Sequence, residues 1–368
     1  MSSLFLETLT LSHFRSHKKG AITCDGQPLA IFGPNGAGKT NILEAVSLFS
    51  PGRGLRRASA EDMARRPEAL GWKLTGMLKS GGHTHEIDIR SDSGAARQVR
   101  IDQKASLQTA LARITKVLWL IPTMDRLWIE GAEGRRRFLD RMTLSFFPDH
   151  AEATVSYEKS MRERNRLLKD QVSDPHWYVA LERQMAESGH RIHDARMEAL
   201  ARLSTAQTAA QTAFPAAHLE LIQLEGDMPN TAADLCGALA DSRRRDMVAA
   251  RSLVGPHRSD LHGVYKDKGI PARNCSTGEQ KALLVSLILA NARALLKDFG
   301  APPLLLLDEV AAHLDANRRA ALYDEICSLG AQAWMTGTER ELFQTLGSRA
   351  QYLEVTEEGG ISSILTPQ

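Results

Sequence analysis

The sequence predicts an α/β fold, in which a head with an antiparallel β subdomain is interrupted by an inserted helical arm. Three observations predict this arrangement. A glycine-rich turn at 33–40 lies between a strand-like and a helix-like segment, and an apolar run at 304–307 ends in two carboxylates. Strand patterns also almost vanish between about 130 and 250. We therefore expect a discontinuous head, residues 1–130 and 250–368, and an arm, residues 131–249.

The glycine-rich turn fits the pattern G-x-x-x-x-G-K-[ST], which is typical of a P-loop. Its glycines allow backbone N–H groups to turn toward phosphate oxygens. Lys39 would reach the β and γ phosphates of a nucleotide, and the Thr40 hydroxyl would ligate Mg²⁺. The alternative is a glycine-rich turn that matches the pattern by chance, and the strand before it and the helix after it argue against that alternative. The predicted nucleotide-binding residues are Gly33, Asn35, Gly36, Ala37, Gly38, Lys39, Thr40 and Asn41.

Short strands are expected before the P-loop, at 4–11, 21–23 and 29–32, because apolar residues alternate or cluster there. Arg15 lies in the stretch Phe14-Arg15-Ser16-His17 between the first two strands. A lone arginine is more often a surface cation. This one is nevertheless placed to reach a bound nucleotide, and we include it in the predicted site.

A basic loop follows the P-loop helix, which we expect over 41–49. It contains Arg53, Arg56 and Arg57 among glycines and a proline, which suits contact with phosphates of a nucleotide or a nucleic acid. The alternative is a solvated charged loop. Beyond it, alternating residues over 72–102 predict an antiparallel meander, and 116–121 predicts a short buried strand.

The segment between about 130 and 250 is expected to form the arm. Apolar residues with three-to-four spacing begin at Tyr178, and the pattern continues to Phe214, where Pro215 would end the helix. At 1.5 Å per residue this helix would be roughly 50 Å long. Because it has only one narrow apolar stripe, we expect it to pack on helices at 155–168 and 232–253.

A polar turn follows the arm at 255–261, and it contains His257. A histidine in such a turn is more often a satisfied structural residue than a catalyst. The turn by itself therefore assigns no chemistry.

Four leucines at 304–307 followed by Asp308 and Glu309 predict a buried parallel strand with acids at its carboxyl end. This is the Walker B pattern. Asp308 would hold Mg²⁺, directly or through water, and Glu309 would orient the attacking water or accept its proton. A strand that ends in a polar pair is common, but together with a P-loop the pattern favours a nucleotide-hydrolysing site.

Upstream of that strand, Ser276-Thr277-Gly278-Glu279-Gln280 precedes an apolar helix at 282–296. Ser276 with Glu279 fits an ordinary capping box. The same groups also offer a hydroxyl, a glycine N–H and a helix N-terminus to an anion.

Charge balance, cysteine spacing and the distribution of apolar residues exclude several classes of protein. The 368 residues contain 46 basic and 44 acidic side chains, so an anionic partner must meet a local patch. The four cysteines are scattered without a C-x-x-C pair, which argues against a zinc site or a disulfide framework. No secretory leader or long apolar run is evident, so we expect a cytoplasmic protein.

The order of P-loop, S-x-G-[EQ]-Q, Asp308-Glu309 and Ala311-Ala312-His313-Leu314-Asp315 resembles the ABC ATPase superfamily. The resemblance implies that two heads sandwich ATP, with Ser276, Gly278, Glu279 and Gln280 acting in trans and Asp315 in a loop that crosses the interface. Thr336 stands where transporter heads have a switch histidine, and no glutamine is evident at the equivalent of the Q-loop.

Spacing separates the branches of this superfamily, since Lys39 and Ser276 are farther apart than in transporter heads but closer than in SMC proteins. Within it, the chain resembles the RecF family of recombinational repair over nearly its whole length. The stretches that carry this resemblance are 14–17, 33–45, 134–140, 157–159, 164–165, 167–169 and 255–258.

The RecF resemblance implies an ATP-dependent homodimer that clamps duplex DNA near single-strand gaps and helps RecR and RecO to load RecA. It also implies slow, DNA-stimulated and Mg²⁺-dependent hydrolysis. Arg53, Arg56 and Arg57 are the predicted DNA contacts. Two alternatives stay open at this point. One is an ATP-gated recruitment module in which hydrolysis is incidental, and the other is a transporter-type motor with a membrane partner.

Overall fold

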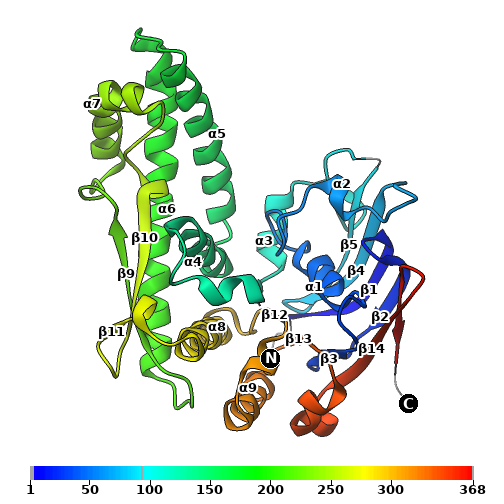
Figure 1. The fold of residues 1–368 in the computed structure, drawn as a ribbon. Coiled ribbons are helices and arrows are strands. Elements are labelled where there is room, and N and C mark those ends of the chain that lie inside the picture. Colours follow the sequence, from blue (N-terminus) through cyan, green and yellow to red (C-terminus); the bar gives the residue numbers. More distant parts are fainter. Residues whose placement is uncertain (1–3, 93, 367–368) are drawn as a thin grey trace. The chain divides into compact units, whose positions relative to one another are not determined.

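The computed structural model describes residues 4–92 and 94–366, which form two compact units (Figure 1). The first comprises residues 1–125, 206–216 and 276–368, and the second comprises 126–205 and 217–275. Residues 250–275, which the sequence pattern places in the head, lie in the second unit. The reason is strand pairing, because β10 (Ser259–Tyr265) forms a ladder with β9 (Ala217–Gln223).

A six-stranded sheet in the first unit has the order β15-β14-β3-β13-β12-β8. The five strands from β14 to β8 are parallel, and β15 is antiparallel to β14. The central strands are buried and apolar, as a parallel sheet covered on both faces requires. Their bounds are β3 Leu29–Phe32, β8 Val117–Leu120, β12 Leu304–Leu307, β13 Ala333–Gly337, β14 Gln351–Glu358 and β15 Ile361–Leu365.

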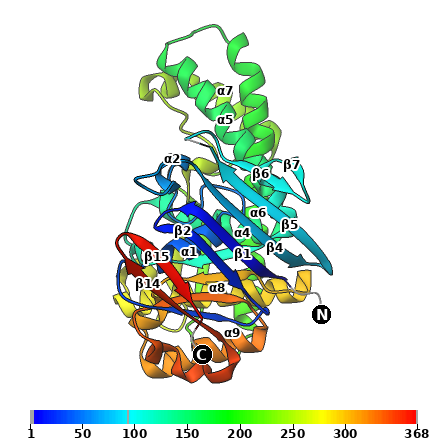
Figure 2. The same ribbon diagram turned by 90° about the vertical axis from the view of Figure 1, so that its right-hand side faces the viewer.

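A second six-stranded sheet in this unit is antiparallel, with the order β2-β1-β4-β5-β6-β7 (Figure 2). Side chains of β4 alternate between buried and more exposed positions, so one face of this strand supplies the core. The antiparallel meander predicted over 72–102 is confirmed by β4, β5 and β6, which pair in chain order. The strands of the whole sheet are β1 Leu4–Phe14, β2 His17–Thr23, β4 Trp72–Ser80, β5 His83–Ser91, β6 Gln98–Ile101 and β7 Lys104–Ser106.

The P-loop helix α1 (Lys39–Ser47) contacts β1 of the antiparallel sheet and β13 of the parallel sheet. Ile42, Leu43 and Val46 of this helix belong to a single apolar cluster that includes residues of both sheets. The two sheets and the helix therefore share one core, which fixes the start of α1 at the edge of the parallel sheet. The other helices of the unit are α2 Ala60–Met63, α3 Leu111–Ile114, α8 Thr277–Phe299 and α9 Ala316–Leu329.

Four helices and a small sheet form the second unit. The helices are α4 Ala132–Phe146, α5 His150–Lys169, α6 His176–Thr208 and α7 Ala232–Ala249, and the strands are β9, β10 and β11 Ile270–Pro271. The last residues of α6 lie in the first unit. Apolar side chains of α5, α6 and α7 form one cluster, so the predicted packing of the long helix on two partners is confirmed.

Two details of the predicted arm are wrong. The long helix ends at Thr208 and not at Phe214, so the chain leaves the helix before Pro215 forces it to. Strand β9 also lies within the segment predicted to be almost free of strands. Its residues alternate between more buried and more exposed positions, a pattern that its pairing with β10 explains. Across the described ranges, no helix is both long and apolar enough to cross a bilayer.

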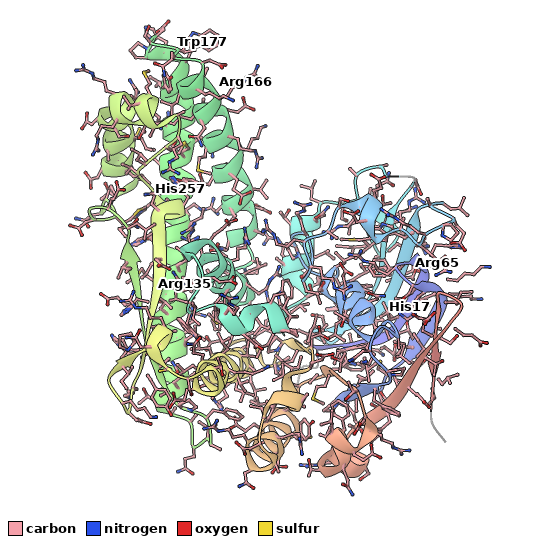
Figure 3. The ribbon with its side chains drawn as sticks, viewed as in Figure 1. His17, Arg65, Arg135, Arg166, Trp177 and His257 are labelled. Atoms are coloured by element: carbon pink, nitrogen blue, oxygen red, sulfur yellow. The ribbon has the colours of Figure 1, made fainter. Side chains whose placement is uncertain are left out.

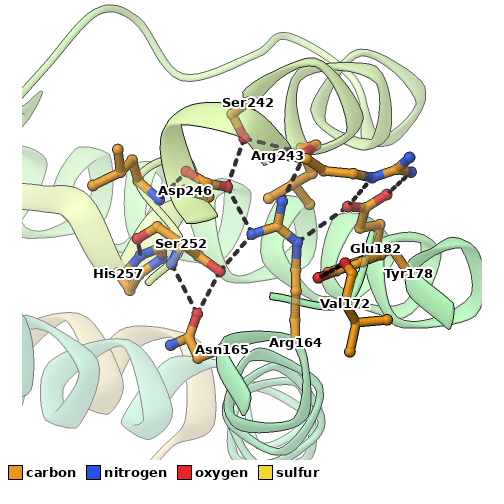
Figure 4. Close-up of polar contacts among 12 residues, drawn as sticks. Arg164, Asn165, Val172, Tyr178, Glu182, Ser242, Arg243, Asp246, Ser252 and His257 are labelled. Atoms are coloured by element: carbon orange, nitrogen blue, oxygen red, sulfur yellow. Dashed lines mark hydrogen bonds and ion pairs between the residues drawn. The ribbon is translucent and has the colours of Figure 1, made fainter. Parts of the chain in front are cut away.

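A buried polar network ties α5, α6 and α7 together around Arg164 (Figure 4). The Arg164 guanidinium is fully buried and donates to Glu182 Oε1 at 3.1 Å, Asp246 Oδ2 at 2.7 Å and the Leu239 carbonyl at 2.7 Å. Glu182 also pairs with Arg243, and Asp246 accepts from Ser242. Each buried charge therefore has an opposite charge and further hydrogen bonds, which compensate for its loss of hydration.

The turn after α7 joins this network through Ser252 and His257. Ser252 accepts from Arg164 at 2.8 Å and donates through its hydroxyl to Asn165 Oδ1 at 2.8 Å. His257 Nε2 lies 2.9 Å from the Ser252 carbonyl, so Nε2 carries the proton and Nδ1 accepts from the Tyr157 hydroxyl at 2.7 Å. The interpretation of His257 as a satisfied structural residue is confirmed.

Gly255 permits the close approach of this turn to α5. Its φ of 128° is disfavoured for other residues, and a Cβ there would lie 2.3 Å from the Tyr157 hydroxyl oxygen. The stretch 255–258 therefore packs against α5 and leads directly into β10, which begins at Ser259.

We predict that Arg164→Met destabilises the protein by about 3–5 kcal/mol, because it leaves Asp246 buried without its cation and Glu182 with one partner fewer. The measurement is urea unfolding followed by circular dichroism. Arg166→Met is the matched control on the same helix, since the Arg166 side chain is exposed (Figure 3). Its Nε lies 3.9 Å from Asp170 Oδ2. It should change stability by less than about 0.5 kcal/mol. Equal effects of the two variants would contradict the role given to the network.

A second prediction concerns pH. Burial lowers the pKa of His257 to about 4. Between the unfolded pKa of about 6.5 and that value, only the unfolded chain takes up the proton, so stability falls as pH falls. The stability difference between wild type and His257→Gln should shrink by roughly 2 kcal/mol from pH 7 to pH 5. His176→Gln, at the exposed start of α6, is the control for the exchange of a histidine for glutamine outside this network. A pH-independent difference for His257→Gln would refute this assignment.

Candidate functional site

The loop between β3 and α1 has the backbone of an anion cradle. Gly33, Gly36 and Gly38 have φ values of 145°, 82° and 103°. A Cβ on Gly33 would lie 2.1 Å from the Val355 carbonyl oxygen, so only glycine fits at the end of β3. The loop leads directly into the N-terminus of α1, where backbone N–H groups lack partners within the helix.

The Lys39 ammonium is buried and lies over this loop. It donates to the carbonyl oxygens of Gly33 at 2.7 Å and Pro34 at 2.8 Å. Burial lowers the pKa of Lys39, and the nearby carboxylates of Glu309 and Asp308 oppose that shift. A phosphate oxygen entering the loop would offer this cation a charged acceptor in place of two carbonyl groups, which is a stronger type of hydrogen bond.

Asp308 joins the ends of three segments. Its carboxylate accepts from the Thr40 hydroxyl at 2.9 Å and from the Thr336 hydroxyl at 2.8 Å. Thr336 in turn accepts from the Glu309 backbone N–H at 2.9 Å. The structure thus brings together the P-loop threonine, the two predicted acids and the residue predicted at the switch position. Sequence reasoning assigned Thr336 only a position, whereas the structure gives it contacts with Asp308 and Glu309.

These groups suit a divalent cation. The Thr40 hydroxyl and the Asp308 carboxylate are hard oxygen donors within hydrogen-bond distance of each other, and Mg²⁺ uses one or two such protein ligands beside phosphate oxygens. Glu309 has a left-handed backbone with φ of 54°, uncommon for a residue other than glycine. Glu309 lies where the chain has left β12, between Asp308 and the next turn. The hydrogen bond from its N–H to Thr336 holds its backbone there.

Arg15 is engaged by groups of its own unit. Its guanidinium forms a bidentate pair with the fully buried Glu44, at 2.7 and 2.8 Å, and donates to the Asp62 carbonyl at 2.7 Å. Its contact with a nucleotide stays a prediction. Sequence reasoning missed the role of Glu44, and the signal that was available is an acid on the otherwise apolar helix run 42–46.

The basic loop divides into two kinds of arginine. Arg56 donates to Asn41 Oδ1 at 2.7 Å and lies 3.4 Å from Glu44 Oε2, so it points to the P-loop helix. All three arginines are exposed, so the difference between Arg56 and the other two is its contact with the P-loop helix. Asn41 also donates to Ser16 at 2.7 Å, so its side chain joins the loop to the β1–β2 turn.

Ser276 caps α8 as the capping-box alternative predicts. Its hydroxyl accepts from the Glu279 N–H at 3.4 Å, and the Glu279 carboxylate accepts from the Ser276 N–H at 2.8 Å. Ser276 and Gly278 are exposed, whereas Gln280 is buried. Asp315 similarly caps α9 by accepting from the Arg318 N–H at 2.9 Å. A cap does not exclude contact with a second subunit, so the action of these residues in trans stays a prediction.

The sequence model of the RecF/RecN/SMC N-terminal domain family matches residues 5–363. The DNA replication and repair protein RecF of Rhizobium rhizogenes strain K84 is 46% identical over 370 residues, covering 98% of each chain. The protein of the same name from Brucella abortus strain 2308 is 42% identical over 362 residues, covering 95% of this chain and 94% of its own.

Solved structures agree on the fold. The recombination mediator protein RecF with ATP, described as part of the RecFOR pathway, superimposes with a TM-score of 0.83 at 23% identity and covers 99% of this chain and 98% of its own. An Smc head domain with an extended coiled coil from Pyrococcus furiosus gives a TM-score of 0.56 at 16% identity, with coverage of 99% and 96%. The predicted ABC-type head fold is confirmed.

Proposed function

This chain belongs to the RecF family of DNA replication and repair proteins, and from that premise we propose that it binds ATP, dimerises, and clamps duplex DNA near single-strand gaps. Slow Mg²⁺-dependent hydrolysis would release the DNA. The observation that carries the proposal is the meeting of Thr40, Asp308 and Thr336 beside the Lys39 ammonium, with the Glu309 backbone bound to Thr336.

Nucleotide would bind with its phosphates in the loop 33–40. The backbone N–H groups at the start of α1 and the Lys39 ammonium supply the positive potential that phosphates require. Thr40 and Asp308 would hold Mg²⁺, which neutralises charge on the phosphate oxygens when it is bound.

Glu309 would orient the attacking water and accept its proton. The hydrogen bond from its N–H to Thr336 fixes the position of its backbone, and the side chain is only partly exposed. The same threonine donates to Asp308. We therefore propose that Thr336 holds the metal ligand Asp308 and the base Glu309 in fixed positions relative to each other.

The dimer would form with each P-loop facing the signature residues of the other subunit. The exposed Ser276 hydroxyl and Gly278 N–H lie at the N-terminus of the 23-residue helix α8, whose dipole favours an anion. Glu279 and Gln280 would support this face, and Asp315 at the start of α9 would lie in the loop that crosses the interface.

DNA phosphates would contact Arg53 and Arg57, which are exposed on the basic loop. Arg56 faces Asn41 and Glu44, so we propose that it connects this loop with the nucleotide site. RecO-like and RecR-like mediator proteins are the proposed partners in loading RecA, in keeping with the RecFOR pathway named for a structural relative.

The first experiment is the mass of Glu309→Gln measured by light scattering with ATP and Mg²⁺, with and without a short gapped duplex. Loss of the base should trap the closed state, so we expect a dimer that needs ATP and retains DNA. Lys39→Ala is the control, and it should stay monomeric because it lacks the phosphate-binding cation. A Glu309→Gln protein that is monomeric under every condition would rule out the clamp.

DNA contact can be tested through salt dependence. Arg53→Ala and Arg57→Ala should weaken binding to duplexes of all sequences alike, and each should reduce the slope of log K against log salt by about 0.9. Arg349→Ala is the control, since Arg349 pairs with Asp324 at 2.7 Å on another part of the same unit. An altered sequence preference would contradict phosphate contact.

A further inference from the structure

Residues where β1 turns into β2 contact the phosphate-binding loop and the start of α1. His17, the first residue of β2 (labelled in Figure 3), is fully buried. Its Nε2 lies 3.1 Å from the Gly38 carbonyl oxygen. Gly38 is the N-cap of α1 and immediately precedes Lys39. None of the functions assigned above involves His17, although it contacts the phosphate-binding loop itself.

The direction of this hydrogen bond follows from its chemistry. A carbonyl oxygen only accepts, so Nε2 carries the proton and donates it to Gly38. Burial lowers the pKa of His17 below its ordinary value, and the positive charge of Arg65 acts in the same direction, whereas hydrogen bonding to backbone carbonyl groups opposes this shift. The net lowering favours the neutral ring near pH 7. Nδ1 is then an acceptor, and within the described residues no donor reaches it. Of the two ring nitrogens, Nδ1 is therefore buried without a hydrogen-bond partner among the described residues, and Nε2 donates to the phosphate-binding loop.

The hydrogen bond controls a peptide plane. In a trans peptide the C=O and the following N–H point in opposite directions, so the orientation of the Gly38 carbonyl sets the direction of the Lys39 N–H. The Gly38 carbonyl accepts from both the Asn41 N–H, at 3.1 Å, and His17. These two donors bind the carbonyl edge of the peptide group, so the Lys39 N–H is held at the opposite edge. The hydrogen bonds also increase the polarity of that N–H.

The packing around Gly38 leaves little freedom for this plane to turn. A Cβ on Gly38 would lie 2.4 Å from the Ser362 hydroxyl oxygen and 2.7 Å from that of Ser16. These two hydroxyls are hydrogen-bonded to each other at 2.6 Å. Arg65 donates to the carbonyls of Ser16 and Gly360 at 2.9 and 2.7 Å, which ties the β1–β2 turn to the C-terminal hairpin.

We propose that His17 is a positioning residue for nucleotide binding: its Nε2–H holds the peptide between Gly38 and Lys39 so that the Lys39 N–H faces the phosphates. The inference rests on the proposed binding of ATP at this loop. Ser16 and Ser362 back the same glycine, so the C-terminal hairpin is part of the support.

The test measures the affinity of a fluorescent ATP analogue with Mg²⁺ for the full chain, together with urea unfolding. His17→Asn and His17→Leu should bind about tenfold more weakly, which corresponds to the loss of one hydrogen bond of about 1.4 kcal/mol. His17→Gln should bind within about threefold of wild type, because its amide nitrogen sits at the distance of Nε2 along the side chain, whereas the asparagine amide is one carbon shorter.

Gln332→Leu is the control for lost stability alone. Gln332 is buried, exchanges two hydrogen bonds with the Leu6 backbone, and precedes β13, at the opposite end of that strand from Thr336. It should lower stability and leave affinity unchanged.

Three outcomes would overturn the inference: wild-type affinity for both His17→Asn and His17→Leu, equal loss in His17→Gln and His17→Asn, or equal loss in Gln332→Leu. If His17→Leu does not fold, the comparison of the two amide variants decides. A wild-type protein that does not bind the analogue would instead refute the proposed function, and the inference with it.

Discussion

The hydrogen bonds that Asp308 accepts from Thr40 and Thr336 connect three parallel strands at one edge of one sheet. Thr40 follows β3 through the P-loop, Thr336 is in β13, and Asp308 follows β12. Strand β13 lies between β3 and β12, and the Asp308 carboxylate at the end of β12 accepts from the threonines that belong to the other two. The carboxyl ends of parallel strands are where α/β proteins bind ligands, and here the strand order decides which residues meet there.

Around this edge, arginine and glutamate side chains connect the loops to the P-loop helix. Glu44 is a buried carboxylate that faces Arg15 and Arg56, so one acid on α1 holds a residue of the β1–β2 turn and a residue of the basic loop. Such a pair is costly to break, because the remaining charge would be buried without compensation. Through Arg56, the basic loop is thus connected to the P-loop helix.

The second unit shows that a family motif need not be a chemical site. Tyr157, Arg164, Asn165 and His257 belong to stretches that resemble the RecF family, and all four lie in the polar network among α5, α6, α7 and the following turn. Polar groups with this many fixed partners specify one packing of the helices, whereas apolar side chains tolerate several. These four family-like residues therefore serve to pack the helices of the arm.

The sequence by itself determined the elements with a strong local signal: the P-loop between strand and helix, the buried β12 with its two acids, the meander of alternating strands and the cap at Ser276. These depend on glycine conformations, side-chain periodicity and short-range hydrogen bonds, which act within a few residues. Only the tertiary structure decided the contacts of Thr336, Glu44 and His17 and the pairing of β9 with β10, because each joins segments that are distant in the chain. Local patterns also predicted an arm that ended at residue 249, whereas strand pairing placed residues 250–275 with the helices. Periodicity shows which side chains become buried, but the strand order and the packing of the core decide what they meet.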